Sequence, residues 1–160
     1  MHNPEDILSP LVREGMAVAD IGCGMGYFSI AMARMVTSTG RVFAVDVQQK
    51  MLTIMHKRAT NAGVAERIHP VLAANDDIKI KDPLDFILAF WMVHEVTDIP
   101  RFFSQVEAAL KEGGKVLYVE PKLHVPMHRF QDILEDARKT GFRISDGPVI
   151  AISRTAILLK

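Results

Sequence analysis

A glycine-rich segment near the amino terminus carries the strongest chemical signal in the sequence. It reads V-A-D-I-G-C-G-M-G-Y-F over residues 18–28, so a strand-like run leads into three alternate glycines and then into a helical pattern. Glycines in such a loop let the backbone turn sharply and approach a ligand without Cβ atoms in the way. Taken alone, the segment could also be a tight strand-to-helix turn that binds nothing.

An acidic residue at the end of the next predicted strand favours a ligand-binding loop over a turn that binds nothing. Asp46 ends the run V-F-A-V-D, which follows the first predicted helix. Ligands of open α/β sheets bind beyond the carboxyl ends of the strands, where a carboxylate can accept hydrogen bonds from both hydroxyls of a ribose. Oxidoreductases that bind NAD or flavin use the spacing G-x-G-x-x-G. Here Gly26 comes one position early and Tyr27 stands in its place, which argues against a dinucleotide.

The elements that must position these residues alternate along the chain. Helical spacing and β-rich runs follow one another with short connections, which predicts a mostly parallel sheet with helices on both faces. The last two runs are joined by Asp146, Gly147 and Pro148 and predict a terminal antiparallel hairpin. The predicted strands are 16–21, 41–46, 68–72, 84–90, 115–120, 142–145 and 149–159, and the predicted helices are 27–36, 48–62, 99–111 and 127–140.

Composition narrows the class of protein. The 160 residues predict one domain, 1–160, with 49% hydrophobic residues for its core. Nineteen basic residues balance nineteen acidic ones, so overall charge does not favour nucleic acid or a membrane surface as partner. A lone cysteine, Cys23, and the absence of a signal-like leader or a long apolar run favour a cytoplasmic protein.

These segments together resemble the class I S-adenosylmethionine-dependent methyltransferases. Residues 18–34 resemble the family's first motif, an acid followed by G-x-G-x-G, and V-F-A-V-D-V-Q-Q-K-M-L resembles its ribose-binding motif. A-A-N-D-D-I, L-D-F-I-L-A-F-W-M-V-H-E-V-T-D and L-K-E-G-G-K-V-L-Y-V-E-P follow in the family's order. Within the class, the chain looks most like small ubiquinone-methyltransferase-like and type 11 members.

The resemblance implies a Rossmann-like three-layer sandwich with a seven-stranded sheet and S-adenosylmethionine as the cofactor. It implies that the glycine loop lines the methionine and sugar portions, with Asp20 near the amino end of the cofactor. Asp46 would hold the ribose, and the backbone at Phe90 would face the methionine amine. The complete set of implied cofactor residues is Asp20, Gly22, Cys23, Gly24, Gly26, Asp46, Val47, Gln48, Asn75, Asp76 and Phe90.

His94 is the first candidate for a catalytic residue. Methyl transfer from a sulfonium needs an in-line nucleophile, and a base helps when the acceptor is a hydroxyl or a protonated amine. His94 follows the fourth predicted strand on the side expected to bind the ligand, where Glu95 could orient it. The alternative is a histidine that caps the loop or packs beside Trp91.

Further residues are candidates to contact the acceptor. Three of them have an alternative role without a ligand. Trp91 could belong to the core, and Glu120 could be a buried cap. His124 could be one of several exposed loop residues. We expect no metal site, and Cys23 is interpreted as a small residue against the cofactor rather than as a nucleophile. The candidate substrate residues are Tyr27, Trp91, Glu120 and His124.

The expected function is therefore methyl transfer to a small or lipid-like molecule. Two alternatives stay open: an RNA or protein methyltransferase that works with a partner subunit, and a cofactor-binding module without catalysis. The short segments before residue 16 and between residues 120 and 127 leave little chain to cover the transferring methyl. We therefore expect a homodimer or a bulky acceptor to provide the cover, with the dimer favoured.

Overall fold

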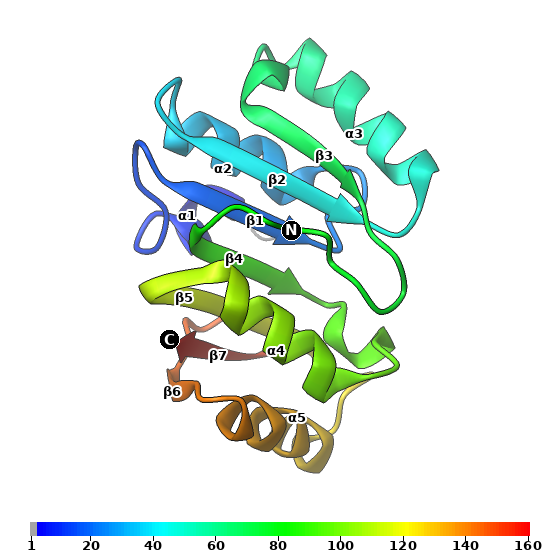
Figure 1. The fold of residues 1–160 in the computed structure, drawn as a ribbon, viewed down its shortest axis with the longest axis vertical. Coiled ribbons are helices and arrows are strands. Elements are labelled where there is room, and N and C mark those ends of the chain that lie inside the picture. Colours follow the sequence, from blue (N-terminus) through cyan, green and yellow to red (C-terminus); the bar gives the residue numbers. More distant parts are fainter. Residues whose placement is uncertain (1–2) are drawn as a thin grey trace.

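The computed structural model describes residues 3–160, which form one β-sheet covered by helices on both faces (Figure 1). Its strands are β1 (Ala17–Ile21), β2 (Arg41–Asp46), β3 (Ile68–Leu72), β4 (Leu84–Phe90), β5 (Leu110–Pro121), β6 (Arg143–Asp146) and β7 (Ser153–Leu159). Its helices are α1 (Pro4–Leu8), α2 (Tyr27–Val36), α3 (Gln49–Asn61), α4 (Ile99–Ala109) and α5 (Met127–Lys139), with two 3-10 turns, η1 (Ala65–Arg67) and η2 (Val93–Glu95).

The seven strands have the order β3-β2-β1-β4-β5-β7-β6. The first five run parallel, whereas β7 pairs antiparallel with both β5 and β6. The predicted mostly parallel sheet with a C-terminal antiparallel hairpin is therefore confirmed. The chain order reverses between β1 and β4, and a reversal of this kind opens a crevice at the carboxyl ends of the two strands.

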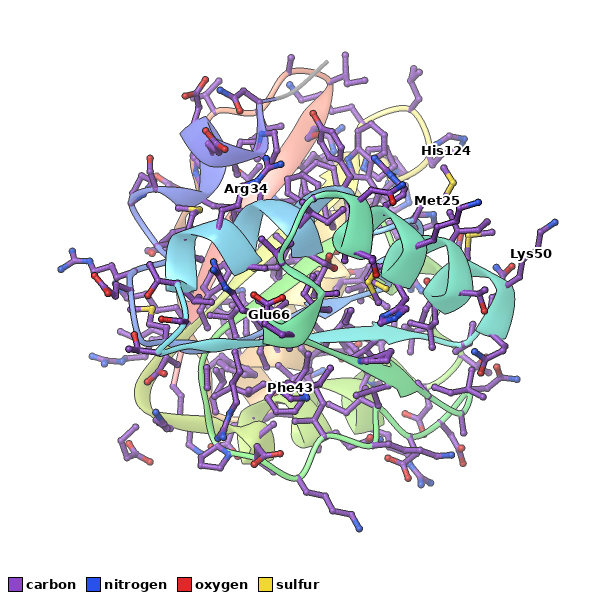
Figure 2. The ribbon with its side chains drawn as sticks, turned by 90° about the horizontal axis from the view of Figure 1, so that it is seen from above. Met25, Arg34, Phe43, Lys50, Glu66 and His124 are labelled. Carbon is purple, nitrogen blue, oxygen red and sulfur yellow. The ribbon has the colours of Figure 1, made fainter. Side chains whose placement is uncertain are left out.

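Two hydrophobic layers hold the helices to the sheet. Helices α1, α2 and α3 cover one face, and α4 and α5 cover the other. Figure 2 views the molecule toward the β3 edge of the sheet, and Phe43 of β2 points away from α2 and α3. That side chain belongs to the core under α4 and α5, whereas its neighbours Val42 and Ala44 belong to the other layer. This alternation explains why the central strands are apolar on both faces.

The start of β5 differs from the sequence-based prediction. We predicted a helix over residues 99–111, but α4 ends at Ala109 and β5 begins at Leu110. Leu110 pairs with Leu84, and Lys115 pairs with Phe86, so residues 111–114 form an irregularity within the strand. Gly113, with φ of +76°, supplies the left-handed backbone that this bulge requires. Pairing with β4 therefore overrides the helical pattern.

The hairpin is also shorter than predicted. Strand β7 begins at Ser153 rather than at residue 149, because residues 147–152 form the connection from β6. Among the described residues, no helix is long and apolar enough to cross a membrane.

Candidate functional site

The glycine loop joins β1 to α2 at the carboxyl edge of the sheet. Its three glycines, Gly22, Gly24 and Gly26, all have positive φ, of +77°, +51° and +81°. A Cβ atom at Gly26 would collide with the side chain of Met55 on α3, so this glycine allows the loop to pack against that helix. A Cβ atom at Gly24 would meet nothing within 4 Å, which leaves open space above the middle of the loop.

Asp46, at the end of β2, holds this loop in place. One carboxylate oxygen accepts a hydrogen bond from the backbone N–H of Gly24 at 2.9 Å, and the other accepts from the backbone N–H of Gln48 at 2.9 Å. A carboxylate offers about four acceptor positions. Two of them are therefore still available to hydroxyl groups of a ligand.

A cavity of about 400 Å³ opens beside the loop and Asp46. Ligand pockets of proteins have volumes of about 300–1,000 Å³. Its walls come from the ends of β1, β2 and β4, from the segments that follow β3 and β4, and from α4. Eight residues predicted from the sequence are among those that line it: Gly22, Asp46, Val47, Gln48, Asn75, Asp76, Phe90 and Trp91.

Sequence reasoning missed the contribution of α4 to this cavity. Phe102 and Gln105 line it together with Ile78. The side chain of Gln105 accepts a hydrogen bond from the backbone N–H of Ile78 at 2.9 Å and donates to the carbonyl of Asp76 at 2.8 Å. It thus ties the segment after β3 to α4. An amide on the buried side of an amphipathic helix was the only available signal, and it does not identify a partner.

Four predicted cofactor residues do not line the cavity: Asp20, Cys23, Gly24 and Gly26, of which Asp20 and Cys23 have buried side chains. Asp20 is 2% exposed and accepts a 2.6 Å hydrogen bond from the hydroxyl of Ser29 on α2. Burial raises the pKa of the Asp20 carboxyl to about 6 against the lowering effect of the Ser29 hydrogen bonds. Burial likewise raises the pKa of the Cys23 thiol. A raised pKa favours the neutral thiol, and the interpretation of Cys23 as a small residue against the cofactor stays a prediction.

Trp91 lines the cavity in a strained backbone conformation. Its φ of +58° is rare for a residue with a bulky side chain. The backbone N–H donates to the carbonyl of Val119 at 2.8 Å, and the indole N–H donates to the hydroxyl of Ser153 at 3.0 Å. Two strands thus fix the ring at the cavity wall, next to Phe90, at a centroid distance of 5.2 Å. Strain that the surrounding structure maintains is common at functional sites.

His94, in η2, is paired with Glu120 at the end of β5. One carboxylate oxygen of Glu120 lies 2.6 Å from Nδ1 of His94, and the other accepts from its backbone N–H at 2.9 Å. The Glu120 side chain is wholly buried, which favours the buried role named as the alternative to contact with an acceptor. Burial raises the pKa of the Glu120 carboxyl, and the hydrogen bonds from His94 act in the opposite direction. Glu95, the orienting residue expected from sequence, lies 3.9 Å from Nε2.

The two remaining candidates lie in different places. His124, in the loop between β5 and α5, is exposed, and its ring is parallel to that of His94 at a centroid distance of 6.3 Å. Figure 2 shows His124 on the same side of the molecule as Met25 of the glycine loop. Tyr27 does not line the cavity. It lines a separate surface hollow together with Pro4 and Arg58. Within residues 3–160, no three His, Cys, Asp or Glu side chains are grouped to hold a metal ion.

Comparisons with known proteins point to methyltransferases. A family model described as a methyltransferase domain matches residues 18–114. A ubiquinone/menaquinone biosynthesis C-methyltransferase of Haemophilus ducreyi is 31% identical over 110 residues, which cover 68% of this chain and 42% of that protein. A demethylmenaquinone methyltransferase of Symbiobacterium thermophilum is 29% identical over 119 residues, which cover 74% and 47%. The chain thus spans less than half the length of these relatives.

The fold has similar solved structures. A crystal structure of a SAM-dependent methyltransferase from Aquifex aeolicus superposes with a TM-score of 0.85. The match covers 98% of this chain and 89% of that one at 21% sequence identity.

Proposed function

Since the chain belongs to the class I S-adenosylmethionine-dependent methyltransferases, we propose that it binds S-adenosylmethionine beside Asp46 and transfers the methyl group to a small or lipid-like acceptor. The single observation that carries the proposal is Asp46, which clamps the glycine loop and keeps acceptor positions for a ribose at the wall of a cavity of suitable size.

The residues around the cavity fit the parts of this cofactor. Val47, Gln48, Asn75 and Asp76 would surround the adenine, with Ile78 and Phe102 as apolar walls for its ring. Gly22 and the backbone at Phe90 would meet the methionine portion. The open space at Gly24 would let the cofactor approach the backbone of the loop. Asp20, Cys23 and Gly26 would hold the loop in shape through packing on the side away from the cofactor.

The acceptor would bind past the methionine end of the cofactor, near Trp91, His94 and His124. When bound, the cofactor supplies an electrophilic methyl group, and the chain's own residues orient the acceptor and exclude water. Trp91 offers a fixed apolar wall, and His94 a nitrogen that can take a proton. The names of the quinone-pathway relatives support a small, lipid-like acceptor and a carbon atom as a candidate for methylation. One domain over residues 1–160, a homodimer and a cytoplasmic location are further predictions.

Transfer of a labelled methyl group tests the proposal. The purified chain should move label from methyl-labelled S-adenosylmethionine into the small-molecule or lipid fraction of a cell extract. The Asp46→Ala variant should transfer much less at a limiting cofactor concentration. Label in RNA or protein would replace the proposed acceptor with a macromolecular one. No label in any fraction, despite tight cofactor binding, would favour a binding module and contradict catalysis.

A further inference from the structure

We propose that Glu120 is a positioning residue that fixes His94 in the tautomer with hydrogen on Nδ1, so that Nε2 is free to take a proton from the acceptor. This inference rests on the proposed function and specifies its acceptor class. The acceptor would be a group that must lose a proton as it gains the methyl, such as a hydroxyl, an amine or an acidic carbon. Thioethers and tertiary amines, which carry no such proton, need no base.

The geometry around Glu120 favours one tautomer of His94. The backbone N–H of His94 can only donate, so Oε1 of Glu120 acts as an acceptor at 2.9 Å. The second oxygen, Oε2, lies 2.6 Å from Nδ1. When Glu120 is ionised, its carboxylate only accepts hydrogen bonds, so Nδ1 then carries the hydrogen. A neutral imidazole with hydrogen on Nδ1 has its free electron pair on Nε2.

The surroundings of the pair leave Nε2 as the accessible nitrogen. The Glu120 side chain is 0% exposed, whereas that of His94 is 24% exposed. His94 itself does not line the cavity, but Met92, two residues before it, and Glu95, directly after it, do. The imidazole is therefore more exposed than the carboxylate with which it pairs, and Nε2 is the ring nitrogen that does not contact Glu120.

Other titratable groups around the pair are few. Glu95, with a side chain 77% exposed, is 3.9 Å from Nε2, and the His124 ring lies parallel to that of His94. Tyr118 of β5 faces Glu120, and Arg129 of α5 acts electrostatically on Tyr118. Among these groups, only Glu120 is within hydrogen-bonding distance of Nδ1.

The proton and the electrons balance in the proposed step. The acceptor atom forms its bond to the methyl carbon with its own electron pair, and the electron pair of the broken C–S bond stays on sulfur. The proton of the acceptor moves to Nε2, which makes His94 an imidazolium. Its positive charge is stabilised by the Glu120 carboxylate until the proton passes to water.

Replacement of Glu120 with glutamine should reverse the tautomer. The side-chain amide offers one oxygen and one NH₂ group, while the backbone N–H of His94 requires the oxygen. The NH₂ group must then face Nδ1, which accepts, so the ring hydrogen moves to Nε2 and the base is lost. The variant keeps the shape of the side chain and changes only the hydrogen-bond polarity.

Nitrogen-15 NMR of the histidine rings of the full chain tests the proposal, with His94→Gln used to assign the signals. Wild-type His94 should show hydrogen on Nδ1 when the ring is neutral, and Glu120→Gln should show it on Nε2. Glu95→Gln is the matched control and should leave the wild-type tautomer in place. The rate of methyl transfer into the cell extract should fall by at least about tenfold in Glu120→Gln, with cofactor affinity unchanged.

A wild-type tautomer with hydrogen on Nε2 would overturn the proposal, and this measurement does not depend on whether the variant folds. An unchanged transfer rate in folded Glu120→Gln would also overturn it. If the wild-type chain did not bind the cofactor, the proposed function itself would be contradicted. Since the NMR measurement needs no cofactor, the two failures are distinguishable.

Discussion

Replacing Asp46 with alanine should weaken the binding of S-adenosylmethionine by about 10- to 150-fold. Hydrogen bonds to a charged group contribute about 1.5–3 kcal/mol, and each 1.4 kcal/mol changes a dissociation constant about tenfold. The substitution removes the carboxylate proposed to bind the ribose. It also removes the acceptors for the N–H groups of Gly24 and Gln48, so the loop loses its clamp.

Titration calorimetry measures this loss, and Asp82→Ala is the matched control. Asp82 has a half-exposed side chain whose carboxylate lies 3.5 Å from Arg41, the residue that begins β2 at the end opposite Asp46. Its removal should leave cofactor affinity unchanged. Equal affinities of wild type and folded Asp46→Ala would contradict the proposed ribose contact.

Gly24→Val should weaken cofactor binding at least as much as Asp46→Ala. The substituted side chain would project into the open space above the loop that the cofactor is proposed to occupy. It would also strain the backbone, because φ is +51° at this position and β-branched residues rarely adopt positive values.

Gly63→Val separates these two effects. Gly63 follows α3, has a φ of +70° and, like Gly24, would place a Cβ atom in open space. Both variants should therefore lose similar stability in thermal unfolding, but only Gly24→Val should lose cofactor affinity. If the two variants bind the cofactor equally well, the glycine loop is a structural turn and no more.

The sequence alone predicts the fold and much of the cavity, because these depend on local patterns. The apolar strands, the glycine loop and Asp46 lie within short segments whose spacing reflects the geometry of a parallel sheet. Positions at strand ends could therefore be assigned to one edge before the structure was known.

Contacts between distant segments could not be predicted in the same way. The pair of His94 and Glu120 depends on the register of β4 and β5, in which Phe90 lies opposite Val119. That register includes the bulge at residues 111–114, which the helical pattern of the sequence conceals. The link from Gln105 to the segment after β3 depends similarly on how α4 packs.

Titration calorimetry of the wild-type chain with S-adenosylmethionine, S-adenosylhomocysteine and NAD tests the central claim most directly. The spacing of the glycines, the position of Asp46 and the family membership predict that both sulfur nucleotides bind and that NAD does not. Tighter binding of NAD than of both sulfur nucleotides would contradict the account.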